Sequence, residues 1–153
     1  MAAYFCDTSA IVKCYVNEPG TAWLVSVTDR AAGGRVFVVG ITGAETVAAL
    51  TRKSRGGGLS PADAAAAIAA FRHDFTNEFG VVAVTPRLIG MAMTLAERHG
   101  LRGYDSVQLA AALITQARRR ARGLSPLTLL SADTELNAAA VAEGLVVDDP
   151  NTH

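Results

Sequence analysis

The sequence predicts a three-layer α/β/α fold, in which helices cover both faces of a mainly parallel, five-stranded sheet. Four short, continuously apolar runs and a shorter fifth are typical of parallel strands that are buried on both faces. Helical patterns separate these runs, and strands that alternate with helices indicate a parallel sheet. The chain has 153 residues, which is enough for such a core, and we expect one domain over residues 1–153.

The apolar runs place the expected strands at residues 4–6, 36–39, 81–84, 127–130 and 145–147. The expected helices lie between them. The first five cover residues 10–16, 21–32, 42 to the glycines at 56–58, 61–78 and 86–99. The sixth begins at 102–105 and runs beyond 114, and the last begins after Ser131 or Asp133 and ends at 143. No internal repeat or long linker interrupts this order.

Capping side chains and helix breakers mark the ends of these helices. Residues that can cap a helix precede four of them, namely Ser9, Thr42, Ser60 and either Ser131 or Asp133. Thr42 with Glu45 three residues later has the pattern of a capping box. Pro61 occupies a first helical position, where proline is favoured, and Gly100 is expected to close the helix at 86–99.

Composition excludes several classes of protein. Half of the residues are hydrophobic and 18% are charged, which argues against disorder. No apolar stretch is long enough to cross a bilayer, and the start MAAYFCDTSA lacks the basic region of a secretory signal, so we expect a cytoplasmic protein. Cys6 and Cys14 have neither CxxC spacing nor histidine partners, so we expect buried, reduced thiols and no zinc site.

The charges are balanced, with 14 basic and 14 acidic residues. The chain is therefore not a polycation that coats nucleic acid by charge alone. Its basic residues include two runs, Arg52, Lys53 and Arg55 in the first and Arg118, Arg119, Arg120 and Arg122 in the second. Both runs fall at expected helix C-termini, where a solvated basic face complements the helix dipole.

Four acidic residues, far apart in the chain, each follow an expected strand or lie in the first turns of an expected helix: Asp7, Glu45, Asp105 and Asp133. In a parallel sheet, these positions line one crevice, so we expect the four carboxylates to meet there. Gathered carboxylates repel one another unless a cation neutralises them or some hold protons. Oxygen ligands without histidine or cysteine suit Mg²⁺ or Mn²⁺ better than zinc. The pattern therefore indicates a metal-dependent site that cuts phosphodiester bonds.

Each acid alone also has a structural explanation, because acidic side chains stabilise helix N-termini. Asp7 distinguishes the two interpretations, since Ser9 is the better placed cap. The phosphate-binding patterns GxGxxG and GxxxxGK[ST] and the hydrolase pattern GxSxG are absent. Aspartyl-phosphate phosphatases resemble Asp-x-Asp, whereas Ser9 fills the second position here, and no lysine follows the last strand as in a phospho-receiver domain.

Four segments around these acids carry a family resemblance. The first is Asp7-Thr8-Ser9-Ala10-Ile11-Val12-Lys13, followed by Tyr15, Glu18 and Gly20. The second is Glu45 with Leu50 and Arg52, and the third is Leu101-Arg102-Gly103-Tyr104-Asp105-Ser106 running into Leu109-Ala110-Ala111-Ala112. The fourth is Leu130-Ser131-Ala132-Asp133 with Leu136-Asn137-Ala138-Ala139, where Ser131 stands at a position often filled by threonine. In this order, the segments resemble PIN-domain ribonucleases, and more narrowly the VapC toxins of bacterial toxin–antitoxin pairs.

The resemblance implies a PIN-like fold and an Mg²⁺-dependent endoribonuclease, with Mn²⁺ able to substitute, that acts as the toxin of a type II toxin–antitoxin module. It implies four catalytic residues, Asp7, Glu45, Asp105 and Asp133. We assign Asp7 and Asp105 as direct metal ligands, with Glu45 and Asp133 holding metal-bound waters or a second ion. A metal-activated water would attack phosphorus, and Arg102 and the basic helix ends are candidates to hold the phosphates of single-stranded or looped RNA.

The resemblance also implies two protein partners, a small antitoxin that wraps the toxin and a second copy of the chain in a homodimer. The apolar residues at 10–12, 15–16, 23–25 and 27 are expected to leave a groove for an amphipathic antitoxin helix, although at least half of them would be core. Two alternatives stay open. One is a metal-dependent phosphatase of small phosphoesters, and the other is a non-catalytic PIN-like scaffold that binds RNA or protein.

Overall fold

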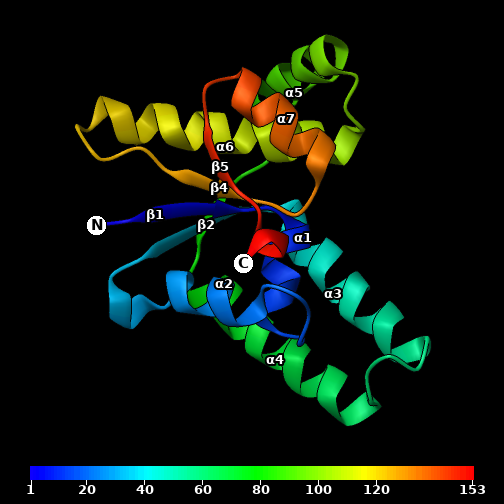
Figure 1. Cartoon of the computed structure of the whole chain (residues 1–153). Helices are drawn as coiled ribbons and strands as arrows, with labels where there is room; N and C mark the ends of the chain where they lie inside the picture. Colours follow the sequence, from blue (N-terminus) through cyan, green and yellow to red (C-terminus); the bar gives the residue numbers. More distant parts are fainter.

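The computed structural model describes residues 1–153, and its sheet has five parallel strands in the order β3-β2-β1-β4-β5 (Figure 1). The strands are β1 (Ala3–Cys6), β2 (Arg35–Val39), β3 (Gly80–Val82), β4 (Thr128–Leu130) and β5 (Val146–Asp148). In the centre, Phe5 of β1 lies opposite Phe37 of β2 and Leu129 of β4. The predicted fold class is confirmed, and the sheet is parallel throughout.

Helices cover both faces of this sheet, with α5, α6 and α7 on one side and α2 and α4 on the other (Figure 1). The α-helices are α1 (Thr8–Ile11), α2 (Thr21–Thr28), α3 (Ile41–Arg55), α4 (Pro61–Asn77), α5 (Pro86–His99), α6 (Gly103–Ala121) and α7 (Thr134–Ala142). Short 3₁₀ turns are η1 (Val12–Cys14), η2 (Arg30–Ala32) and η3 (Pro150–Thr152). None of the helices is both long and apolar enough to span a bilayer.

Alternate residues of the strands supply the two halves of the core. On β2, Val36 and Val38 pack on the side of α2 and α4, whereas Phe37 and Val39 face α5 and α6. Successive side chains of a strand point to opposite faces, so both faces of each strand must be apolar. The largest cluster lies under α6, whose residues at 109–112 are Leu-Ala-Ala-Ala and fully buried.

Three of the predicted helix ends are confirmed. Ser60 caps α4 by accepting a hydrogen bond from the N–H of Asp63 at 3.1 Å, with Pro61 in the first helical position. Gly100 closes α5 with a left-handed φ of 65°, and Asp133 caps α7.

Two other helix starts differ from the prediction. The cap of α1 is Asp7, not Ser9, and the helix begins two residues earlier than expected. Helix α3 begins at Ile41 without a side-chain cap, so Thr42 and Glu45 form no capping box. The expected helix at 21–32 also divides into α2 and η2. At the starts of α1 and α3, the side chains of Ser9, Thr42 and Glu45 have hydrogen-bonding partners on other elements instead.

The two cysteines are free, as expected, although only Cys6 is fully buried and Cys14 is half-buried. Burial is the main cause that raises the pKa of both thiols, to about 11 for Cys14. Neutral thiols are poor nucleophiles and poor metal ligands, which favours a purely structural role for both.

Candidate active site at the carboxyl edge of the sheet

Asp7 is the most buried of the four predicted acids, with 3% of its surface exposed directly after β1. Its carboxylate accepts three hydrogens, from the N–H of Ala10 at 2.9 Å, the hydroxyl of Ser9 at 2.7 Å and the hydroxyl of Ser131 at 2.8 Å. The pKa of Asp7 is raised to about 6, mainly by burial and also by the Asp133 carboxylate, although these hydrogen bonds lower it. A carboxylate has about four acceptor sites, so one site of Asp7 stays available.

Ser131 connects Asp7 to the next acid, Asp133. The Ser131 hydroxyl donates to Asp7 Oδ2 and accepts a hydrogen bond from the N–H of Asp133 at 3.1 Å. Asp133 Oδ1 accepts from the N–H groups of Glu135 and Leu136, both at 3.0 Å, so one of its oxygens caps α7. Oδ2 of Asp133 accepts no hydrogen bond from the protein.

Glu45 lies in the second turn of α3 and is held by α1 and α6. Its Oε1 accepts from the hydroxyl of Thr8 at 2.9 Å and from Nε2 of Gln108 at 3.3 Å. Nε2 of Gln108 also lies within hydrogen-bond distance of Thr8 and Thr42. This network explains why Thr42 and Glu45 do not cap α3, since both side chains are used between helices.

Thr8 and Gln108 are site residues that the sequence reasoning missed. Gln108 is buried on α6, three residues after Asp105, and its neighbours at 107 and 109–112 are all apolar. A single amide at such a position is unusual, because a buried polar group needs a hydrogen-bonding partner. That isolated polar position was the available signal.

Asp105 is half-buried in the first turn of α6 and accepts no hydrogen bond from the protein. Burial raises its pKa, the carboxylates of Asp133, Glu45 and Glu135 raise it further, and the Arg102 guanidinium lowers it. Asp105 therefore lies within electrostatic reach of both Asp133 and Glu45. The Asp133 carboxylate also raises the pKa of Asp7. Electrostatic interactions therefore link all four predicted acids at the carboxyl ends of the strands.

The donor set suits a hydrated divalent cation. No three acidic, histidine or cysteine side chains are close enough to bind an ion together. Mg²⁺ does not need such a cage, since it keeps several waters and usually takes one or two carboxylates. Buried Oε1 of Gln108, beside Glu45, accepts no hydrogen bond from the protein.

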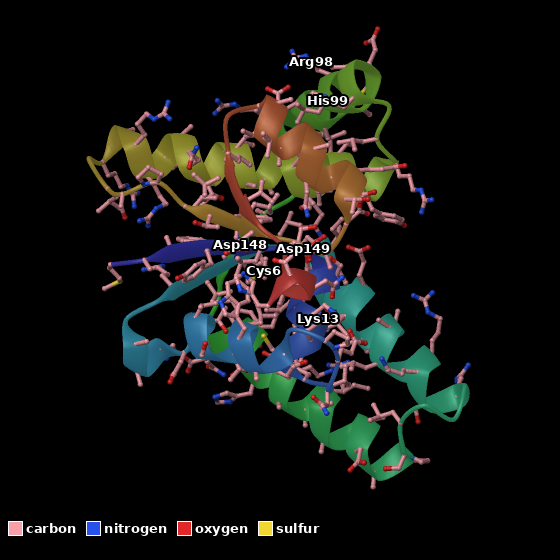
Figure 2. The ribbon with its side chains drawn as sticks, viewed as in Figure 1. Cys6, Lys13, Arg98, His99, Asp148 and Asp149 are labelled. Carbon is pink, nitrogen blue, oxygen red and sulfur yellow. The ribbon has the colours of Figure 1, made fainter.

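His99, in the last turn of α5, lies away from the four predicted acids. Nε2 of His99 is 2.7 Å from Glu143, which also pairs with Arg98. Figure 2 shows Arg98 and His99 at the outer end of α5, well away from Cys6 at the end of β1. These contacts join α5 to α7. Another imidazole, that of the terminal His153, lies 2.8 Å from Asp148 at the end of β5.

A large cleft lies away from the four predicted acids, none of which lines it. A cleft of about 900 Å³ lies beside α2 and α4, and Ile11, Tyr15 and Val25 are among the residues that line it. The hydroxyl of Tyr15 donates to Asp74 Oδ2 at 2.6 Å in its wall. Among the residues expected to form an apolar groove, Ala10, Ile11, Val16 and Leu24 are buried core, whereas Val25 is 45% exposed. We call this cavity the α2–α4 cleft.

Comparison with known proteins gives a consistent picture of the fold. The sequence model of the PIN domain matches residues 4–142. No curated protein sequence matches the chain.

Among solved structures, PAE2754 from Pyrobaculum aerophilum has a TM-score of 0.65 at 20% identity, over 99% of this chain and 85% of that one. A toxin–antitoxin complex from Klebsiella pneumoniae gives a TM-score of 0.64 at 13% identity, over 98% of each chain. VapC20 from Mycobacterium tuberculosis, described as a sarcin-ricin loop cleaving toxin, gives 0.62 at 21% identity, over 94% of this chain and 96% of that one. At these identities, the likeness is one of fold.

Proposed function

Because this chain belongs to the PIN domain family, whose members are nucleases, we propose that it is an endoribonuclease that depends on a divalent cation, Mg²⁺ or Mn²⁺. The observation that supports this most directly is the state of Asp105. Its carboxylate has no hydrogen-bond donor in the protein, and burial and the nearby acids Asp133 and Glu45 raise its pKa against the effect of Arg102. A cation beside such a carboxylate would offset the repulsion from the neighbouring acids and favour the ionised form.

We propose Asp7 and Asp105 as the residues that bind the cation directly. Asp7 has one acceptor site left, and both oxygens of Asp105 are available. Glu45 Oε2 and Asp133 Oδ2 accept no hydrogen bond from the protein and are placed to orient water. When bound, the cation would offset the charge of the phosphate and lower the pKa of a water on it.

The surrounding polar residues orient two of the four acids. Ser9 and Ser131 fix the plane of the Asp7 carboxylate, and Thr8 and Gln108 fix that of Glu45. Such support is needed because a small displacement of a catalytic group costs a large part of the rate. Arg102, which is exposed one turn before Asp105, is the side chain that we propose to hold an RNA phosphate at this edge.

The test compares cleavage of a single-stranded RNA and of p-nitrophenyl phosphate, with Mg²⁺ and with EDTA. We expect Mg²⁺-dependent cleavage of RNA only, and its loss in Asp7→Asn and Asp105→Asn proteins. Asp63→Asn, an exposed acid at the start of α4, is the matched control and should cleave normally. Hydrolysis of p-nitrophenyl phosphate would support a phosphatase, and binding of RNA without cleavage would support a scaffold. Wild-type rates in both site variants would overturn the assignment.

We propose further that the chain is the toxin of a type II toxin–antitoxin module. The solved structures of similar fold include toxin–antitoxin complexes, and the α2–α4 cleft offers the partly apolar hollow that an antitoxin segment requires. An amphipathic helix would present anchors at i, i+3 and i+4 to such a cleft.

We propose that two copies associate through the outer side of α5. Ile89 is 39% exposed and Met93 is 69% exposed, and their four-residue spacing places them on one face of the helix. Exposed apolar residues that lie together mark an interaction surface more often than single ones do. A mass in solution of one chain, unaffected by Met93→Glu, would contradict this proposal.

A further inference from the structure

A second charged feature lies at the opposite end of α6 from Asp105. A cleft of about 260 Å³ beside the edge strand β3 is lined by four arginines, Arg35, Arg118, Arg119 and Arg122. We call it the arginine cleft. Helix α6 begins at the carboxyl edge and ends near the amino ends of the strands (Figure 1). Arg118 is thirteen residues after Asp105, so the two sites are about 20 Å apart along the helix axis.

The base of the arginine cleft is the ring of Phe37. The guanidinium carbon of Arg35 lies 5.3 Å from the ring centroid, and that of Arg119 lies 6.0 Å from it. Phe37 is itself seated on Gly80, where an added Cβ would lie 2.5 Å from Phe37 Cδ1. Cation–π contacts of this kind hold guanidinium groups in place without neutralising them.

The arginines of the cleft have no acidic partners. No aspartate or glutamate lines the cleft, and none of its four arginines takes part in an ion pair. Arg119 is buried and uses Nε and Nη2 to bind Ser125, which leaves its Nη1 without a protein acceptor. Stabilisation of the helix dipole accounts for basic residues at the end of α6, but not for Arg35, which comes from β2.

We propose that the arginine cleft binds a backbone phosphate of single-stranded RNA, as a second contact with the substrate distant from the scissile bond. This inference rests on the proposed ribonuclease activity. Guanidinium groups match the geometry of phosphate oxygens through paired N–H donors. The chain has no net charge, so its affinity for RNA must come from local groups such as these. Only an RNA long enough to span both ends of α6 reaches both sites.

Binding measurements test the cleft separately from catalysis. The probe is a fluorescent, single-stranded RNA of about 16 nucleotides, followed by anisotropy in EDTA so that it is not cleaved. Arg118→Gln combined with Arg122→Gln changes two exposed arginines of the cleft. Arg72→Gln combined with Arg87→Gln removes the same charge from exposed arginines that lie outside the cleft and outside both basic runs. Equal thermal melting of the two proteins verifies that both are folded.

We expect the cleft variant to bind about tenfold more weakly, with the slope of log K against log salt reduced by about 0.7, the contribution of one phosphate contact on a single strand. The control variant should stay within roughly twofold of wild type. Equal losses in the two variants, unchanged binding by the cleft variant, absence of RNA binding by wild type, or tighter binding of duplex DNA than of RNA would each overturn the proposal.

A cleavage assay distinguishes failure of the cleft from failure of the proposed function. With Mg²⁺, the cleft variant should cleave an RNA of about 4 nucleotides as wild type does and lose efficiency only on the RNA of about 16 nucleotides. Asp105→Asn should cleave neither RNA and still bind the longer one. If wild type cleaves no RNA, the proposed function fails, while the anisotropy measurements still decide whether the cleft binds phosphate.

Discussion

The hydroxyl of Ser131 donates a 2.8 Å hydrogen bond to Oδ2 of Asp7, which joins two residues 124 positions apart in the sequence. Replacement of Ser131 by alanine removes a bond to a charged acceptor, and such bonds contribute roughly 1.5–3 kcal/mol. Because this bond lowers the pKa of Asp7, its loss should raise that pKa further. We expect the acid limb of the pH–rate profile to move to higher pH and the unfolding free energy to fall.

Ser131→Thr is the matched control, since it retains the hydroxyl. It should preserve the pH profile even if the added methyl group in this fully buried position lowers stability. A Ser131→Ala protein with the pH–rate profile of wild type would show that the bond does not tune Asp7.

The buried carboxylate of Asp7 makes stability depend on pH and metal. In EDTA, its folded pKa of about 6 exceeds the unfolded value of 3.8, so the native state holds the proton more tightly. Stability should therefore fall as pH rises from about 4 to about 6, by roughly 3 kcal/mol at most. The lowered pKa values of Glu18 and Glu143 act in the opposite direction, so the informative quantity is the difference between wild type and Asp7→Asn.

Metal should reverse this loss, because a cation competes with the proton for Asp7. The gain in melting temperature from millimolar Mg²⁺ should grow as pH rises through about 6 and should be mostly absent in Asp7→Asn. Melting curves that do not change across a metal titration of wild type would contradict the proposed cation site.

The strands, and the positions of the four acids after strands or in early helix turns, were predictable because each depends on local pattern. Continuous apolar runs indicate buried strands, and the parallel sheet then places Asp7, Glu45, Asp105 and Asp133 at one edge. The helix caps were less predictable, since either Asp7 or Ser9 can accept an N–H bond, and tertiary contacts decided between them. Ser9 accepts the N–H of Ala132 and donates to Asp7, so it is occupied by another part of the chain.

The remaining features depend on how elements pack, which local pattern does not specify. Gln108 joins the site only because α6 lies against α1 and α3. The arginine cleft exists only because the strand order places β2 and β3 beside the end of α6. The run at residues 118–122 was visible in the sequence, whereas its partner Arg35 was not.

Another prediction concerns Lys13, whose side chain is 7% exposed and pairs with Glu18 at 3.2 Å. Glu18 also pairs with Lys53 on α3. Lys13, which lies in η1, is labelled in Figure 2. Glu18→Gln leaves a buried ammonium without a carboxylate and should lower the unfolding free energy by roughly 1–3 kcal/mol. Because the pKa of Glu18 is lowered, its contribution is present at neutral pH and is lost as pH falls below about 4.5. Glu97→Gln, at an exposed position without an ion pair, should leave chemical denaturation unchanged.

The last prediction tests the toxin assignment in cells. Expression of this chain alone should arrest growth, and Asp7→Asn should relieve the arrest, because toxicity requires cleavage of RNA. Co-expression with the product of the neighbouring gene should restore growth, and the two proteins should purify together with nuclease activity suppressed. Val25→Glu places a charge in the α2–α4 cleft at a position that is 45% exposed, so it should weaken this association and leave cleavage by the purified protein intact. Val141→Glu, on α7 at the other face of the sheet and 61% exposed, should change neither property. A harmless protein that ignores the neighbouring product would show that the chain is not a toxin, and the RNA cleavage assay would then decide independently whether it is a nuclease.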